Sequence, residues 1–96
     1  EYAGVEASPP AIDVFFALDG GAARDRVAGW LQDLRSHGVA CDTDYAGRSL
    51  KGQLTQAARL GAATVVVVRV DGATIRRAGQ ADEGIALDDV SARLSS

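Results

Sequence analysis

The chain has 96 residues, of which 47% are apolar and 24% charged, and its formal net charge at pH 7 is −3. This length suits one domain, and the acidic balance argues against a general nucleic-acid binder, which is normally basic. The longest apolar run, residues 62–68, is too short to span a bilayer. Cys41 is the single cysteine, so no internal disulfide forms, and we expect a cytoplasmic protein without membrane contact. Any contact with a nucleic acid must be local.

The N-terminal stretch, residues 1–11, is polar and contains two prolines. It has neither the basic start nor the apolar run of a signal peptide. We therefore expect a linker or tail at 1–11 and a domain at 12–96, and we expect the whole to be a piece of a longer protein.

The first half of the chain predicts two β-α units. Residues 12–18 form an apolar run typical of a buried strand, and the following helix, about 22–37, has one apolar face. That face carries Ala23, Val27, Trp30, Leu31 and Leu34. Gly38 ends this helix, and residues 39–43 form a short second strand.

The second helix is predicted from Ser49, a suitable N-cap, to Gly61, which ends it. Its buried stripe comprises Leu50, Leu54, Ala57 and Ala58, and a polar stripe comprises Lys51, Thr55 and Arg59. Residues 63–70 then form a continuous apolar run, which is typical of a central strand covered on both faces.

The C-terminal part predicts a hairpin and a final helix. Asp71–Gly72 turns the chain into a strand at 73–78, and residues 79–82 connect that strand to its partner at 83–86. Asp88 is expected to cap a last helix whose inward residues are Leu87, Val90 and Leu94. The order β-α-β-α-β, hairpin, α predicts a three-layer α/β/α domain with a small mixed sheet.

The chain contains no convincing set of catalytic residues. His37 is the only histidine and is expected at a helix end, Cys41 is expected to be a small buried thiol, and Asp42 and Asp44 are expected at a solvated loop edge. The loop at 19–21 follows a strand, but it lacks the spacing of the known phosphate-binding motifs. We therefore expect no metal, no cofactor and no chemistry in this domain.

Two cations stand at the start of the second helix, where the helix dipole disfavours them. Arg48 and Lys51 occupy this place, and Arg69 ends the third strand at the same sheet edge. We hypothesise that these cations and the free helix N–H groups converge on an anion. The alternative is that they are ordinary solvated charges paired with Asp42, Asp44 or Asp71.

Residues 47–68 resemble the most recognisable segment of the C-terminal anticodon-binding domain of histidyl-tRNA synthetases. That segment reads Gly-x-Ser/Lys-Leu/Phe-Lys-x-Gln, then an alanine and a basic residue, then Gly-Ala and a valine or isoleucine run. The matching residues are Gly47, Ser49, Leu50, Lys51, Gln53, Ala57, Arg59, Gly61, Ala62 and Val65–Val68. The resemblance extends over about residues 11–94.

This resemblance implies a five-stranded mixed sheet of order 2-1-3-4-5 with strand 4 antiparallel. It also implies binding to the anticodon stem-loop of a tRNA for histidine. The tRNA-binding residues would be Arg48, Ser49, Lys51, Gln53 and Arg69. The ATP-dependent ligation of histidine would belong to a separate catalytic domain of the parent chain, and we expect the isolated domain to be monomeric.

Two departures from the family pattern keep an alternative open. Arg69 stands where the family usually has glycine, and the connection to the next strand is short. A regulatory or protein-interaction domain of a synthetase-like paralogue, acting without RNA, is therefore the second hypothesis. A small enzyme of flavodoxin-like shape is a third, disfavoured because the chain offers no catalytic set.

Overall fold

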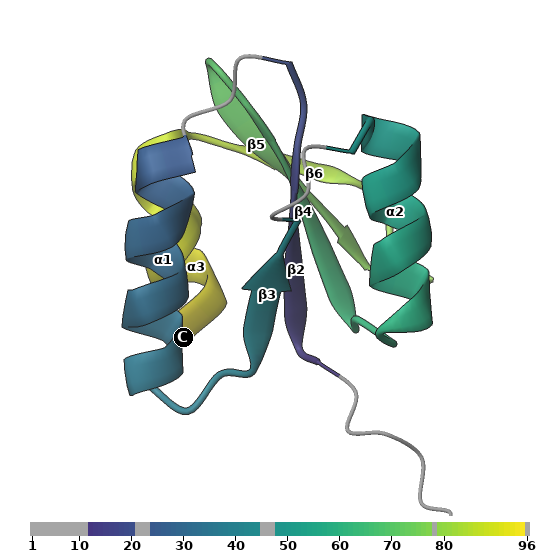
Figure 1. The fold of residues 1–96 in the computed structure, drawn as a ribbon. Helices are drawn as coiled ribbons and strands as arrows, with labels where there is room; N and C mark the ends of the chain where they lie inside the picture. The colour runs from purple at the N-terminus through teal and green to yellow at the C-terminus, as the bar shows by residue number, and fades with distance from the viewer. Residues whose placement is uncertain (1–11, 21–23, 45–47, 78, 96) are drawn as a thin grey trace, which may run out of the picture.

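A computed structural model describes residues 12–20, 24–44, 48–77 and 79–95 of the chain. In it a five-stranded sheet lies between two helical layers (Figure 1). The expected linker at residues 1–11 lies outside the described residues, as does Ala23 of the predicted helix face.

The sheet has the predicted order. Its strands are β2 (Val14–Leu18), β3 (Cys41–Thr43), β4 (Thr64–Arg69), β5 (Gly72–Arg77) and β6 (Glu83–Ile85), arranged β3-β2-β4-β5-β6. β2 pairs in parallel with both β3 and β4, whereas β5 is antiparallel to both β4 and β6. The fourth of these strands is thus the antiparallel one, as the resemblance implied.

The helices divide between the two faces of the sheet. α1 (Arg24–Ser36) and α3 (Val90–Ser95), the latter preceded by the 3-10 turn η1 (Leu87–Asp89), cover one face, and α2 (Leu50–Arg59) covers the other (Figure 1). Because side chains alternate along a strand, Phe16 packs beneath α1 whereas Phe15 packs beneath α2. The predicted three-layer architecture is confirmed.

The central position of β4 is confirmed by burial on both of its faces. Val66 and Val68 are fully buried on the side of α1 and α3, and Val67 is 2% exposed on the side of α2. Trp30, on the apolar face of α1, lies in the core with its ring centroid 5.7 Å from that of Phe16.

The predicted C-terminal ends of α1 and α2 are confirmed, and a glycine lies just after each helix. Gly38 and Gly61 adopt φ of 81° and 69°, a region that glycine enters without strain. Each follows its helix at the expected place, and their N–H groups return to the Arg35 and Ala58 carbonyls.

Several details of the sequence prediction are wrong. The strands at 12–18, 39–43 and 63–70 begin one or two residues later than expected. Ala58 is exposed, and Gln53 takes its place in the buried stripe of α2. Asp88 does not cap the last helix, because it lies inside η1 and its carboxylate pairs with Arg26 at 2.5 Å.

Candidate nucleic-acid interface

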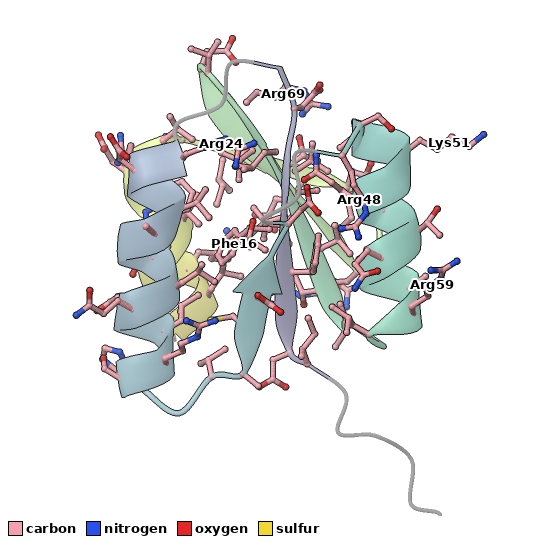
Figure 2. The ribbon with its side chains drawn as sticks, in the orientation of Figure 1. Phe16, Arg24, Arg48, Lys51, Arg59 and Arg69 are labelled. Atoms are coloured by element: carbon pink, nitrogen blue, oxygen red, sulfur yellow. The ribbon has the colours of Figure 1, made fainter. Side chains whose placement is uncertain are left out.

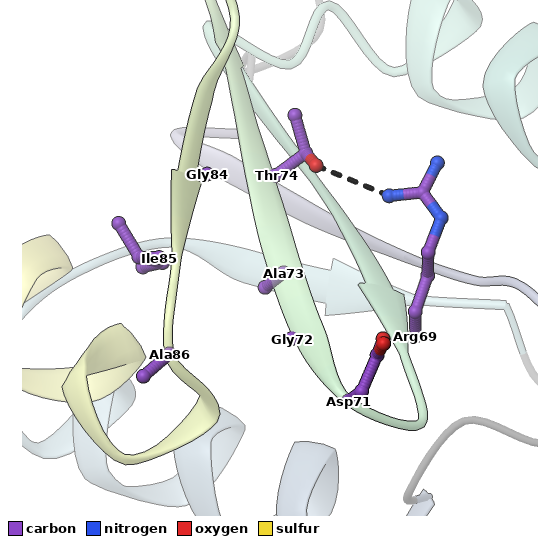
Figure 3. Close-up of a pocket in the computed structure, with 8 residues that line it drawn as sticks. All are labelled: Arg69, Asp71, Gly72, Ala73, Thr74, Gly84, Ile85 and Ala86. Atoms are coloured by element: carbon purple, nitrogen blue, oxygen red, sulfur yellow. Dashed lines mark hydrogen bonds between the residues drawn. The ribbon is translucent and has the colours of Figure 1, made fainter.

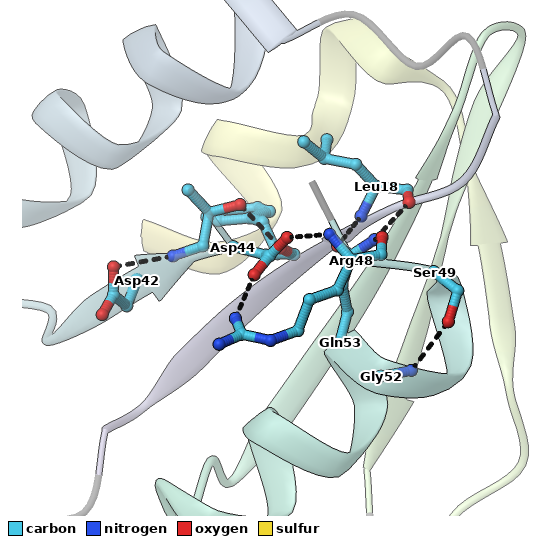
Figure 4. Close-up of polar contacts among 9 residues, drawn as sticks. Leu18, Asp42, Asp44, Arg48, Ser49, Gly52 and Gln53 are labelled. Carbon is cyan, nitrogen blue, oxygen red and sulfur yellow. Dashed lines mark hydrogen bonds and ion pairs between the residues drawn. The ribbon is translucent and has the colours of Figure 1, made fainter. Parts of the chain in front are cut away.

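The start of α2 is fixed to the carboxyl end of β2 by one side chain. Gln53 Oε1 accepts a hydrogen bond from Leu18 N at 2.6 Å, and Nε2 donates to the Leu18 carbonyl at 2.8 Å (Figure 4). Nε2 also donates to the Arg48 carbonyl at 2.9 Å. Gln53 is only 3% exposed, so it lies beneath the surface that its neighbours form, and its amide is used internally.

Arg48 is held by an acidic residue that follows β3. Its main-chain N–H donates to Asp44 Oδ2 at 2.8 Å, and its guanidinium donates to Oδ1 at 2.5 Å (Figure 4). Asp44 is 3% exposed, so the expectation of a solvated loop edge is wrong for this residue. The side chain of Arg48 is half exposed, and the ion pair with Asp44 restrains its guanidinium.

Ser49 and Gly52 shape the first turn of α2. Ser49 is the predicted N-cap, since its Oγ accepts a hydrogen bond from Gly52 N at 3.3 Å. A Cβ at Gly52 would lie 3.3 Å from the Cβ of Arg48. Because glycine has no Cβ, it leaves space at this position for the aliphatic part of the Arg48 side chain.

A shallow hollow of about 410 Å³ runs along the outer side of α2. Its lining includes Arg48, Ser49, Lys51, Thr55, Gln56 and Arg59, and none of the lining residues is acidic. Figure 2 shows Lys51 and Arg59 projecting from the side of α2 that faces away from the sheet. Within the described part of the chain, no ion pair involves either side chain. We call this surface the α2 groove.

The charges of the chain are distributed unevenly, which the net value conceals. Residues 45–70 contain four cations (Arg48, Lys51, Arg59 and Arg69) and no aspartate or glutamate. All 13 acidic residues and the other six cations lie outside this stretch. This acid-free stretch was not among the predicted features, although it follows directly from the order of the residues.

Arg69 lies at the same sheet edge but in a separate hollow. Its Nε is 3.3 Å from Asp19 Oδ2, and its Nη1 donates to Thr74 Oγ1 at 3.1 Å (Figure 3). The hollow beside it, about 400 Å³, is lined by other residues than the α2 groove. The structure thus brings Arg48, Ser49 and Lys51 together and places Arg69 apart from them.

The remaining polar candidates have internal partners. Cys41 is 6% exposed, and burial raises the pKa of its thiol above the ordinary value of 9.0, an effect that the nearby Arg35 opposes. The His37 ring bonds to the Asp33 carbonyl at 2.8 Å, in the last turn of α1. Among residues 12–20, 24–44, 48–77 and 79–95, no group of histidine, cysteine, aspartate or glutamate side chains is placed to hold a metal ion. None of the helices in these ranges is long and apolar enough to cross a membrane.

This fold also occurs among aminoacyl-tRNA synthetases. A structure described as the RNA-binding domain of threonyl-tRNA synthetase from Cryptosporidium parvum Iowa II superposes with a TM-score of 0.64 over 92% of this chain and 23% of that one. The two share 17% of their residues, so this likeness concerns the fold.

The proteins that resemble this chain in both sequence and structure are histidine–tRNA ligases. The apo histidyl-tRNA synthetase of Staphylococcus aureus superposes with a TM-score of 0.77, is 28% identical, and is matched over 90% of this chain and 24% of its own length. The histidine–tRNA ligase of Desulforudis audaxviator is 42% identical over 69 residues, covering 72% of this chain and 16% of the ligase. That of Desulfatibacillum aliphaticivorans is 43% identical over 60 residues, covering 62% of this chain and 14% of the ligase.

The chain therefore spans about one seventh of the length of the curated relatives that it matches. No protein-family model matches it. The resemblance to histidyl-tRNA synthetases is confirmed, and the chain is homologous to a domain-sized part of these ligases.

Proposed function

We propose that this chain is a tRNA-binding module that holds the anticodon stem-loop of a tRNA for histidine along the α2 groove. The observation that carries the proposal is the groove itself, which three cations line and no acidic residue does. The homology to histidine–tRNA ligases supports tRNA as the partner.

The start of α2 suits a phosphate group of RNA. The N–H groups of a first helical turn are only partly satisfied, and the helix dipole is positive there. α2 has no acidic residue in its first turn, and Lys51 in that turn adds a positive charge. A cation at this position is unfavourable in the free protein and becomes favourable when an anion arrives.

The residues of the site have different parts in this proposal. Lys51 and Arg59 contact phosphates as mobile cations, and Arg48 presents a guanidinium that Asp44 restrains. Ser49 offers a hydroxyl at the same helix end, whereas Gln53 positions α2 without touching RNA. Arg69 makes a second, separate contact at the sheet edge.

Ligation of histidine, with its need for ATP, is assigned in this proposal to a catalytic domain elsewhere in a longer chain. The domain itself then carries no chemistry, needs no cofactor, works in the cytoplasm and is monomeric when isolated. Because its net charge is −3, we expect it to bind a stem-loop only in the micromolar range or more weakly.

The proposal is tested with two variants that each change the net charge by one unit. Lys51→Gln removes a positive charge from the α2 groove, whereas Gln32→Glu adds a negative charge to an exposed position of α1, on the opposite face of the sheet. Binding of a synthetic histidine-tRNA anticodon stem-loop is measured by fluorescence anisotropy. We expect Lys51→Gln to weaken binding by about 1 kcal/mol at low salt, the order of one lost phosphate contact, and Gln32→Glu to leave it nearly unchanged.

Equal losses in the two variants would mean that only the total charge matters and that the groove is not the site. An absence of binding by the unmodified chain would overturn the proposal and favour the RNA-independent domain of a paralogue.

A further inference from the structure

Arg48 differs from the other cations of the α2 groove because its whole length is held in place. Its main-chain N–H donates to Asp44 Oδ2 at 2.8 Å, and its carbonyl accepts from Gln53 at 2.9 Å. The aliphatic part of its side chain runs along the first turn of α2, where a Cβ at Gly52 would lie 3.3 Å from the Arg48 Cβ and 3.5 Å from its Cδ. At the far end, Nη1 donates to Asp44 Oδ1 at 2.5 Å. The guanidinium is therefore held in one orientation.

The position of Asp44 is unexpected beside a groove that attracts anions. Its side chain is only 1% exposed, and burial of a carboxylate costs free energy that its hydrogen bonds must offset. Its negative charge also lies next to a groove whose lining contains no acidic residue, and it repels a phosphate there. A groove that needed only positive charge would bind RNA better without Asp44. The direction in which Arg48 presents its donors therefore explains this carboxylate better than the total charge does.

The ion pair leaves one edge of the Arg48 guanidinium available. Figure 4 shows the Asp44 carboxylate meeting a single nitrogen of the guanidinium. Within the residues that the structure describes, no hydrogen bond or ion pair uses Nε or Nη2 of Arg48, and the side chain is half exposed. These two nitrogens carry parallel N–H groups, which is the geometry that binds a phosphate through two hydrogen bonds.

We propose that Asp44 is a positioning residue that directs the Nε–Nη2 edge of Arg48 toward one particular phosphate of the RNA. This contact fixes the register in which the stem-loop lies along α2. The inference rests on the proposed function and gives the cations of the α2 groove different roles. Lys51 attracts any phosphate that comes near, because an ammonium group on a flexible side chain is a mobile point charge. Arg48 binds one phosphate in a defined orientation.

The test replaces each phosphate of a histidine-tRNA anticodon stem-loop, one at a time, by an uncharged methylphosphonate. This change removes one charge and one acceptor oxygen and keeps every base. Binding to the 96-residue chain is measured by fluorescence anisotropy. We expect one position, the critical phosphate, to weaken binding about tenfold, the order of a hydrogen bond to a charged group. The other positions should weaken it clearly less.

Two variants test whether Asp44 acts through Arg48. Asp44→Asn removes the carboxylate and keeps Arg48, whereas Arg48→Lys keeps the positive charge and removes the planar edge. In both variants the loss at the critical phosphate should fall to that at the other positions, because the contact has lost its direction. Asp44→Asn added to Arg48→Lys should change the scan no further. Lys51→Gln should weaken binding overall and leave the critical phosphate distinct.

Asp42→Asn is the matched control on the same strand. Asp42 lies in β3, its side chain is 39% exposed, and it accepts a hydrogen bond from Thr43 N at 2.8 Å. Its replacement removes the same charge as Asp44→Asn and should leave the critical phosphate distinct. Thermal melts of every variant establish that the domain is folded at the temperature of the binding assay.

A measurement on the unmodified chain tests the orientation without any substitution. Nitrogen-15 relaxation of the arginine Nε–H groups reports how ordered each side chain is. Before RNA is added, the Nε–H group of Arg48 should already be ordered, whereas that of Arg59, which has no described ion pair, should be mobile. Equal mobility of the two groups in the free chain would overturn the inference, even if Asp44→Asn does not fold.

The outcomes separate this inference from the proposed function. If no phosphate stands out, or if Asp44→Asn gives the same scan as the unmodified chain, the positioning role is overturned and the α2 groove stands. If Lys51→Gln binds as tightly as the unmodified chain, the groove itself fails. If the unmodified chain does not bind the stem-loop, both proposals are overturned.

Discussion

Gln53 and Leu18 form a two-point clamp in which one side-chain amide satisfies both the N–H and the C=O of a single strand residue, at 2.6 and 2.8 Å. These two hydrogen bonds join the end of β2 to the first turn of α2. The clamp also positions Arg48, whose carbonyl accepts the remaining amide hydrogen at 2.9 Å. The position of the α2 groove therefore depends on Gln53, which is buried and does not line the groove.

Replacing Gln53 with leucine should destabilise the fold. The Leu18 N–H and C=O would be left buried without partners, at about 1–3 kcal/mol for each group that stays dry. Urea unfolding measures the loss, with Gln56→Leu on the same helix as the control, since no described hydrogen bond involves the Gln56 side chain. A Gln53→Leu variant as stable as the control would show that the clamp does not support the fold.

Lys51→Glu should change stability and RNA binding in opposite directions. A glutamate in the first turn of α2 interacts favourably with the helix dipole, so the free energy of unfolding should rise by about 0.3–1 kcal/mol. The same change should weaken stem-loop binding, because it places a negative charge beside the phosphate. Thermal melts and anisotropy titrations on one preparation measure both, and a variant that binds weakly because it unfolds would contradict this prediction.

Gly29→Ala should stabilise the chain without touching the proposed site. Gly29 lies within α1, is exposed, and has open space where a Cβ would stand. Replacing glycine by alanine inside a helix gains about 0.5–1 kcal/mol. Urea unfolding should show this gain, and an unchanged or lower stability would mean that the helix is strained at this position.

Cys41 should make the stability depend on pH above about 9. Burial raises the pKa of its thiol above the ordinary value of 9.0, so as pH rises the unfolded chain loses this proton before the native chain does. The unfolded state then binds fewer protons, and the free energy of unfolding falls with increasing pH. The contribution of Cys41 is fully present below pH 9.0 and is lost as pH rises toward the raised native value.

Cys41→Ser provides the comparison, because a serine hydroxyl does not titrate in this range. Urea unfolding between pH 8 and 10.5 should show a steeper decline for the unmodified chain than for the variant. Parallel declines would mean that the thiol ionises equally in both states.

The sheet could be predicted from the sequence because its signals are local. Apolar runs bounded by glycine define β2 and β4, and the alternation of strands and helices leaves few topologies. Gly38 and Gly61 mark the helix ends by backbone conformation alone. Such features depend little on distant contacts.

The site was harder to predict, because burial at the sheet edge depends on tertiary contacts. Asp44 follows a strand and looks solvated in the sequence, but the Arg48 guanidinium and the nearby elements bury it. Gln53 was predicted to face RNA on the strength of the family motif. Its spacing of three residues from Leu50 and four from Ala57 places it on the buried face of α2, and this periodicity could have shown that it is internal.

The dependence of stem-loop affinity on salt tests the account most directly, because it counts the phosphates that the α2 groove neutralises. For single-stranded RNA, the slope of log K against log salt is about −0.7 for each phosphate neutralised. We predict a clearly negative slope for the unmodified chain and a slope smaller in magnitude by about 0.7 for Lys51→Gln. A slope near zero, or one that Lys51→Gln leaves unchanged, would contradict the claim that the α2 groove binds the RNA backbone.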